Sequence, residues 1–467
     1  MSVSAAHRAS LLVIGGGVGG YTAAIRAARE GLRVTLVERG ELGGTCLNEG
    51  CIPTKSLLHQ AHAFKALQSA HAFGINADSV RLDYQMVDVE KRRVVSQLVG
   101  GVRTLIKRSG IEWIQGNAEF IDARTVGVRE TGARLSADHI VIATGSRPVL
   151  PPIPGMDLPG VMDSAGALAL TQLPASVLIL GGGVIGVEFA QIFSRFGVTV
   201  TLVEQQERML VQEDPELVEV LQRQLAADTL QCHFNVSIVR VEQMGTQLVA
   251  TLADGRRLAA EKVLVATGRR PCTEGLGLDR IGLQLDAGAI VTNEHGQTSI
   301  AHIYAVGDVQ GGQLLAHKAT AQAEAAVAHL RGHGRGTAGL AIANAVYTSP
   351  EIASVGLSEA QARQRHATVK VGRFPFNANG RALAMKSGQG FVKVIADADT
   401  DQILGISMVG PEVTQLLGEA TLAVQMELTL SALMETVHAH PTLSEALMEA
   451  SHDAFNGGAI HLPPHPT

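Results

Sequence analysis

Two cysteines with four residues between them, Cys46 and Cys51, lie in a glycine-rich segment and could do redox chemistry. Pro53 and the residues after it predict the start of a helix, because proline fits a first turn where its missing N–H has no partner to lose. Cys51 would then lie where helix N–H groups and the positive end of the helix dipole favour a thiolate. A pair that opens to give one stabilised thiolate is a catalytic device.

Two nearby cysteines also suit a structural disulfide, a metal pair or two unrelated thiols. A structural disulfide needs an oxidising compartment, of which the sequence gives no sign. A closed metal site needs about four ligands, and the sequence has no second cysteine pair, so no metal is expected. The other cysteines, Cys232 and Cys272, have no second cysteine at a spacing typical of a redox or metal-binding pair, and we expect them to be ordinary thiols.

Length and composition indicate a multidomain α/β enzyme. The chain has 467 residues, enough for about three domains, and its 51 glycines suit many tight strand-to-helix turns. The net charge of −6 gives no basic footprint for nucleic acid. The uncharged run 11–25 resembles a signal-peptide core, but its glycine spacing explains it better, and no apolar stretch is long enough to span a membrane. We expect a cytoplasmic protein with no nucleic-acid or membrane partner.

The chain contains an internal repeat around the motif G-x-G-x-x-G. An apolar strand, the motif and a helix begin at residue 11 and recur 166 residues later. The glycines permit a tight turn and let backbone N–H groups approach a pyrophosphate at the helix N-terminus. A second strand in each copy ends at an acid, Glu38 or Glu204, which is expected to bind ribose hydroxyls. The glycines of the motif are Gly15, Gly17 and Gly20 in the first copy and Gly181, Gly183 and Gly186 in the second.

The acid of the second copy also bears on the choice of nucleotide. A carboxylate at Glu204 would repel a 2′-phosphate, which needs arginines instead. Gln205 and Gln206 follow it, with Arg208 further on. The sequence therefore favours NAD over NADP and leaves some use of NADP open.

A second pair of similar segments marks where the chain crosses between domains. Residues 140–148 resemble residues 263–271, since each is a buried strand that ends in glycine, Gly145 or Gly268, and then proline. The sequence thus predicts an α/β chain with two Rossmann-like domains and a C-terminal α+β domain. The expected divisions are 1–148 for the first part of one nucleotide domain, 149–270 for the other nucleotide domain, 271–340 for the second part of the first together with a central region, and 341–467 for the C-terminal domain.

Taken in order, these motifs resemble a known family. The nucleotide fold, C-x-x-x-x-C, a second nucleotide fold, Ala-x-Gly-Asp at 305–308 and His-Pro-Thr-Leu-Ser-Glu at 440–445 are together similar to the flavoprotein disulfide reductases. Within that family the chain resembles the dihydrolipoamide dehydrogenases across nearly its whole length. The most specific matches are residues 43–55 and 438–445, with 374–382 beside them.

The resemblance implies FAD in the first fold and NAD in the second. The glycines and acid of each repeat would hold the adenosine side of each nucleotide. Lys55 would lie near the flavin ring, Asp308 at the ribityl–phosphate region, and Gly145 in the same site. Glu188 would lie near the nicotinamide or near Lys55, with Gly268 also in the NAD site.

The resemblance also implies the reaction and its partners. The substrate would be a dithiol on the lipoyl arm of an E2 component or of the H-protein of glycine cleavage. His440 would take a thiol proton, because imidazole titrates near working pH, and Glu445 would orient its ring. The substrate would attack Cys46 and leave Cys51 as the thiolate against the flavin. The C-terminal domain would form a homodimer and lend His440 to the partner, whereas His438 is expected to be an ordinary surface or core histidine.

Other members of the same scaffold remain alternatives. A glutathione reductase would need basic residues near position 204, a mercuric reductase would need extra cysteines near the C-terminus, and a soluble transhydrogenase would lack the redox pair. A non-catalytic FAD-bound scaffold would have no physical need of the thiol pair or of His440.

The chain also departs from the family pattern. Thr320, Gln322 and Ala323 lie where acidic residues are common, and Ala343 lies where proline is common. The tail 456–467, rich in glycine, histidine and proline, is either disordered or packed at the dimer edge.

Overall fold

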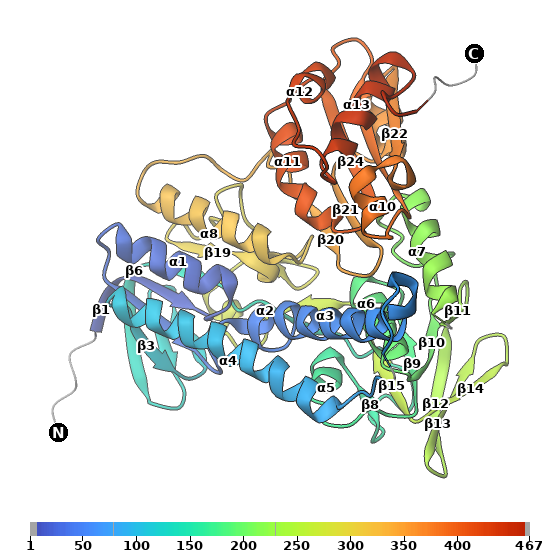
Figure 1. Cartoon of the computed structure of the whole chain (residues 1–467). Helices are drawn as coiled ribbons and strands as arrows, with labels where there is room; N and C mark the ends of the chain where they lie inside the picture. Colours follow the sequence, from blue (N-terminus) through green and yellow to red (C-terminus); the bar gives the residue numbers. More distant parts are fainter. Residues whose placement is uncertain (1–6, 78, 229, 463–467) are drawn as a thin grey trace, which may run out of the picture.

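The structure, a computed structural model, describes residues 7–77, 79–228 and 230–462, and this part of the chain forms three main sheets with their own helices. Figure 1 shows the first unit in blue, cyan and gold, the second mainly in green, and the C-terminal unit in orange and red above them. Helix α3 (Cys51–Gln68) crosses from the first unit to the second, where it packs against α6 (Val184–Arg195). The expected α/β fold, with two Rossmann-like sheets and a C-terminal α+β unit, is confirmed.

The first unit is built on a seven-stranded sheet. Its strands are β1 (His7–Ile14), β2 (Val34–Glu38), β3 (Glu112–Gln115), β4 (Ala118–Asp122), β5 (Thr125–Val128), β6 (Ala133–Ile142) and β19 (Ile303–Ala305). They lie in the order β3-β2-β1-β6-β5-β4, with β19 beside β6. The pairs among β1, β2, β3, β6 and β19 are parallel. Because β19 comes from far along the chain, the segment near residue 303 completes the first sheet.

Helices cover the parallel part of this sheet. They are α1 (Val18–Arg29), α4 (Tyr84–Arg108) and α8 (Ala316–Leu330). Leu11, Val13 and Leu36 are fully buried between the strands and these helices. On the other face, Phe120 and Val126 pack with the 3-10 helix η2 (Leu278–Ile281) and the short hairpin β17 (Leu285–Asp286) and β18 (Ala289–Ile290). Strands covered on both faces are apolar at every position, which explains why residues 11–14 do not alternate.

The second unit repeats the first design. Its parallel strands are β8 (Val161–Met162), β9 (Ser176–Leu180), β10 (Thr199–Val203), β11 (Gln231–His233) and β15 (Lys262–Val265), in the order β11-β10-β9-β15-β8. Its helices are α5 (Ser164–Leu168), α6 and α7 (Pro215–Ala227), and its antiparallel sheet is β12 (Ile238–Met244), β13 (Gln247–Leu252) and β14 (Arg257–Ala260). The order β9-α6-β10 matches β1-α1-β2, as the repeat predicts. The two similar crossing segments pair with each other as β7 (Ser146–Pro148) and β16 (Arg269–Pro271).

The C-terminal unit is an antiparallel sheet under helices. Its strands are β20 (Asn344–Val346), β21 (Glu351–Gly356), β22 (Val369–Pro375), β23 (Phe391–Asp397) and β24 (Ile403–Gly410), in the order β20-β21-β24-β23-β22. Its helices are α9 (Glu359–Arg365), α10 (Gly380–Ala384), α11 (Val413–Gln425), α12 (Leu430–Glu435) and α13 (Glu445–Asn456). Buried Val394, Ile406 and Met408 pack with Ala420 and Leu447 from the helices. Residues 463–467 of the tail lie outside the described residues.

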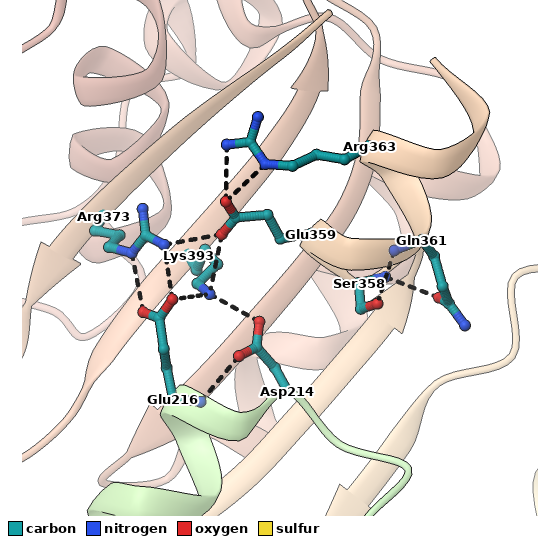
Figure 2. Close-up of polar contacts among 8 residues, drawn as sticks. All are labelled: Asp214, Glu216, Ser358, Glu359, Gln361, Arg363, Arg373 and Lys393. Carbon is teal, nitrogen blue, oxygen red and sulfur yellow. Dashed lines mark hydrogen bonds and ion pairs between the residues drawn. The ribbon is translucent and has the colours of Figure 1, made fainter. Parts of the chain in front are cut away.

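A buried lysine ties the C-terminal unit to the second unit (Figure 2). Lys393 on β23 is 1% exposed, and its Nζ lies 2.7 Å from Asp214 and 2.8 Å from Glu216 at the start of α7, and 3.3 Å from Glu359. Arg373 on β22 binds both Glu216 and Glu359 at 2.8 Å. Arg363 also binds Glu359 at 2.8 Å, so three cations face three carboxylates where the two units meet, which compensates the buried charge.

Candidate active site

A cavity of about 1680 Å³ lies at the carboxyl ends of the parallel strands, where open α/β sheets bind ligands. Single ligand pockets are typically about 300–1,000 Å³, so this cavity has room for more than one ligand. The predicted site residues that line it are Gly15, Gly17, Glu38, Cys46, Cys51, Lys55, Gly145, Asp308, Gly183, Glu188 and Gly268. Gly20, Gly181, Gly186 and Glu204 do not line it.

The glycines at the helix starts fit a dinucleotide. A Cβ on Gly17 would meet its nearest atom at 3.8 Å, and one on Gly145 or Gly183 would meet nothing within 4 Å, so all three face open cavity. Gly17 and Gly183 are the N-caps of α1 and α6, and within the described chain no side chain caps either helix. The first N–H groups of both helices are therefore free to bind pyrophosphate oxygens.

The other glycines of each motif serve packing. Gly15 and Gly181 have φ values of 103° and 105°, which favour glycine. A Cβ on Gly20 would lie 1.8 Å from the carbonyl oxygen of Gly15, and the same clash at Gly186 would be 1.9 Å from Gly181. These positions let the helix approach the preceding strand closely. Some glycines of the motif are therefore needed for packing, and the others for binding the nucleotide.

The acid at the end of the second strand has the same contacts in both repeats. Glu38 accepts a hydrogen bond from the N–H of Gly16 at 2.6 Å, and Glu204 accepts one from Gly182 at 2.6 Å. Each carboxylate therefore lies against the glycine turn. Glu38 also lines the cavity, where a ribose could reach it.

The cysteines lie on two successive helices. Cys46 is in α2 (Gly44–Asn48), and Cys51 is the first residue of α3. Pro53 lies in the first turn of this helix and Cys51 at its N-terminus, as the sequence predicts. Gly50 is the N-cap and Pro53 the third helical residue, and its N–H would also have lacked an intrahelical partner there, so the proline costs nothing. Both cysteines are free thiols.

The surroundings shift the pKa values of the two thiols in opposite directions. The hydrogen bond from Cys46 lowers the pKa of Cys51 to about 7, with help from the charge of Lys55 and against the effects of burial and of Glu188. The same hydrogen bond, together with burial and the charge on Cys51, holds the pKa of Cys46 well above its usual range. Near neutral pH the reduced pair therefore carries its charge on Cys51, while Cys46 keeps its proton.

Three units converge on Lys55. Its Nζ lies 2.8 Å from Glu188 of α6, which is 3% exposed, and 4.7 Å from the ring centroid of Tyr347. The backbone N–H of Tyr347 donates to Glu188 at 3.0 Å. Of the two neighbours expected for Glu188, the structure brings Lys55 to it. Tyr347, which follows β20 in the C-terminal unit, belongs to none of the motifs that predict the site.

Asp308 belongs to a second polar group that the sequence did not predict. It accepts a hydrogen bond from the Ser146 hydroxyl at 2.6 Å, and Arg269 donates to that hydroxyl at 2.8 Å and to Thr45 at 3.3 Å. Arg269 and Ser146 lie on the paired strands β16 and β7. The signal was a charged residue directly after Gly268 in the repeated crossing segment.

The departures on α8 are accommodated locally. Gln322 accepts a hydrogen bond from the N–H of Gly307 at 2.9 Å and so supports the turn that carries Asp308. Thr320 donates to the carbonyl of the preceding helical turn at 3.2 Å, and Ala323 is fully buried. The carbonyl of Ala343 lies 2.8 Å from a ring nitrogen of the His317 side chain.

The predicted imidazole–carboxylate dyad is present on the C-terminal unit. Nδ1 of His440 lies 2.8 Å from Glu445, and the imidazole is 75% exposed. Burial raises the pKa of Glu445, but hydrogen bonds from the Thr442 N–H and from His440 outweigh it and hold that pKa below its usual value. Among the described residues that line the cavity, neither member of the dyad is found, so one subunit does not join it to its own thiols. His438, 4% exposed, binds Glu419 at 2.8 Å and is a satisfied buried histidine.

Comparison with known proteins identifies the class. The family described as pyridine nucleotide-disulphide oxidoreductase matches residues 9–323, and its dimerisation domain matches residues 342–451. The chain belongs to this family and is an oxidoreductase with FAD and NAD⁺ as its cofactors. None of the helices within the described residues is both long and apolar enough to cross a membrane.

Individual relatives are similar over almost their whole length. Dihydrolipoyl dehydrogenase of Bacillus subtilis (strain 168) is 41% identical over 97% of this chain and 100% of its own, and that of Thermus scotoductus is 42% identical over 97% and 98%. Among solved structures, LpdA of Mycobacterium tuberculosis superposes with a TM-score of 0.89 at 27% identity, over 96% of this chain and 99% of its own. The HOCl-induced flavoprotein disulfide reductase RclA of Escherichia coli gives 0.87 at 31%, over 95% and 99%.

Proposed function

We propose that this protein oxidises dihydrolipoamide to lipoamide with NAD⁺ as the acceptor, by opening and re-forming a Cys46–Cys51 disulfide. The observation that carries the proposal is the division of charge between two thiols at one end of a dinucleotide cavity. A pKa of about 7 for Cys51 makes it a good leaving group, because disulfide exchange is faster when the departing thiol is more acidic. The substrate thiolate would therefore attack Cys46 and expel Cys51.

The first half of the reaction transfers two electrons from substrate to the pair. His440 of the partner subunit takes a proton from one substrate thiol, and that sulfur attacks Cys46. The Cys46–Cys51 bond breaks, a mixed disulfide forms, and Cys51 becomes a thiolate. The second substrate thiol then attacks the substrate sulfur of the mixed disulfide and closes the lipoamide ring. The bond to Cys46 breaks, and Cys46 leaves with the proton of that thiol. The substrate is oxidised and the pair is reduced by the same two electrons.

Residues of this chain hold the reduced pair ready for reoxidation. Lys55 stabilises the Cys51 thiolate, and Glu188, which is bound to Lys55, opposes that effect. Bound FAD supplies the transfer of the two electrons from the thiol pair to NAD⁺. The free N–H groups after Gly17 and Gly183 would bind the two pyrophosphates, which keeps both nucleotides at the carboxyl ends of their sheets.

The dyad is proposed to act across a homodimer. Three observations support this arrangement: the imidazole is exposed, the dyad lies on the unit that matches a dimerisation domain, and neither member of the dyad is among the described residues that line the cavity of its own subunit. Glu445 would hold the Nδ1–H of His440, so that Nε2 is left to accept the substrate proton.

The partners and domain limits are proposed on the same basis. Lipoyl domains of an E2 component or of an H-protein would bring the substrate, because they present a dithiol on a flexible arm. Four free cysteines suit a reducing compartment such as the cytoplasm. We propose divisions at 1–148 and 271–340 for the FAD and central region, 149–270 for NAD and 341–467 for dimerisation, which the return of β19 to the first sheet supports.

An anaerobic titration tests the proposal. The purified holoenzyme is reduced with dihydrolipoamide, followed by visible absorption, and then NAD⁺ is added. A long-wavelength thiolate–flavin band that NAD⁺ discharges supports the substrate, the redox pair and the acceptor together. A spectrum that does not respond to dihydrolipoamide, in protein whose flavin NADH still bleaches, would reject the dithiol substrate.

A further inference from the structure

A second imidazole–carboxylate pair lies beside the dyad. Glu449 follows Glu445 by four residues on α13, which is one helical turn on the same face. At Gly457 the helix ends in the left-handed region with φ of 69°, and residues 457–462 fold back along α13. This return brings His461 to Glu449, so the described part of the tail is packed against the helix.

The contacts around Glu449 are those of a built site. Its carboxylate is 2% exposed and accepts hydrogen bonds from the backbone N–H of Ile460 at 2.8 Å and from the Nδ1 of His461. Ala459 and Leu462 pack into the core of the C-terminal unit on either side of these residues. The His461 imidazole itself is 64% exposed. A buried carboxylate thus fixes a solvent-facing imidazole, as Glu445 fixes His440.

The second pair is close enough to act on the first. Burial raises the pKa of Glu445, and the opposing groups that hold it below its usual value include the charge of His461 as well as the Thr442 N–H and His440. An imidazolium at position 461 therefore opposes the negative field of Glu445 and Glu449 at His440.

Most other charged groups on the elements around α13 have partners of their own: Lys370 with Asp401, Arg373 and Lys393 with Glu216, His366 with Asp397, His438 with Glu419, and Asp453 with the Arg373 N–H. Glu435 on α12 and Arg381 on α10 are exposed, and His452 on α13 is half-buried. The charge state of the His461–Glu449 pair is therefore the adjustable contribution next to the dyad.

We propose that His461, held by Glu449, is a positioning residue that sets the charge around the His440–Glu445 dyad and so the pH at which His440 accepts the substrate proton. The inference rests on the proposed function, because it concerns the base of that reaction. His461 touches neither substrate nor thiols in this role. It acts only through the field at His440, so its effect must appear in a pH profile.

The test compares two replacements at one position. In the dimeric holoenzyme, kcat/KM for dihydrolipoamide is measured from about pH 5 to about pH 9 for wild type, His461→Gln and His461→Lys. By Coulomb's law, unit charges that are one to two helical turns apart in water shift each other's titration by no more than about half a pH unit. His461→Gln, which leaves Glu449 uncompensated, moves the acid limb up by about that amount, whereas His461→Lys moves it to or below the wild-type position. Glu449→Gln moves it down, because a negative charge is removed.

Two controls separate this role from a structural one. Thermal unfolding shows whether the tail still packs in each variant, and NADH-dependent reduction of an artificial dye reports the nucleotide half without using His440. Acid limbs that coincide in all variants, or that move in one direction for both Gln and Lys, would overturn the proposal even if the rates fall. If wild type does not oxidise dihydrolipoamide at any pH, the proposed function is wrong and this inference is rejected with it.

Discussion

Replacing Cys46 by alanine removes the contact that most stabilises the Cys51 thiolate. The pKa of Cys51 is lowered to about 7 first by the hydrogen bond from Cys46, then by Lys55, against burial and Glu188. Cys46→Ala deletes the donor, whereas Cys46→Ser keeps an O–H group in nearly the same place. Each variant leaves one thiol of the pair, so the measured midpoint belongs to Cys51 alone.

The size of the change follows from the strength of one charged hydrogen bond. Such a bond contributes about 1.5–3 kcal/mol, and about 1.4 kcal/mol moves a pKa by one unit. The pKa of Cys51 therefore rises from about 7 to about 8–9 in Cys46→Ala. At pH 7 the ionised fraction falls from about one half to about one tenth or less. In Cys46→Ser the midpoint stays within about half a unit of the wild-type value.

The assay is a pH titration of the two holoenzymes. In the proposed arrangement the Cys51 thiolate lies beside the oxidised flavin and would give a long-wavelength absorption band, whose amplitude against pH gives the midpoint for Cys51. A midpoint that is higher by about one unit or more in the alanine variant confirms the role of Cys46 as donor. Equal midpoints in the two variants would refute the reasoning, since burial and Lys55 would then account for the whole effect.

Further predictions concern the domain junction and the base. Lys393→Met leaves buried carboxylates uncompensated and lowers the free energy of unfolding by about 3–5 kcal/mol, measured by denaturant titration, whereas Arg363→Met on the exposed helix α9 costs less than about 1 kcal/mol. The hydrogen bond from Arg373 lowers the pKa of Glu216 from its usual 4.5 to about 2. Since the depressed value belongs to the folded state, the stabilisation is complete above about pH 4.5 and is lost as pH falls toward 2, which thermal unfolding against pH will detect. His440→Gln lowers kcat/KM for dihydrolipoamide by about 10²–10⁴-fold and leaves NADH–dye activity unchanged, and equal loss of both activities would contradict its role as base.

Local sequence patterns predicted most of the fold, but they did not predict contacts between residues that are far apart in the sequence. The strand–glycine–helix repeat identifies β1-α1-β2 and β9-α6-β10 because a single turn geometry requires those glycines. Pro53 correctly indicates the first turn of α3, but it does not identify the first residue, because proline is tolerated anywhere in that turn. The hydrogen bonds that join Ser146, Asp308 and Arg269 link positions more than 100 residues apart. No spacing rule encodes such contacts, and only the packing of β7 against β16 creates them.

The charge on Cys51 depends on how the first unit, which carries α3, is placed against the second unit, which carries α6. Lys55 lowers the pKa of Cys51 and Glu188 raises it, and the two residues are bound to each other across the junction of α3 and α6. Glu188→Gln removes the opposing charge and leaves the charge of Lys55 acting on Cys51 alone, so the Cys51 midpoint should fall below about 7 in the Cys46→Ser background. A rise would mean that Glu188 acts mainly by holding Lys55 in place, since the ammonium would then have moved away from the thiolate. The direction of this one shift therefore distinguishes an electrostatic role for Glu188 from a positional one.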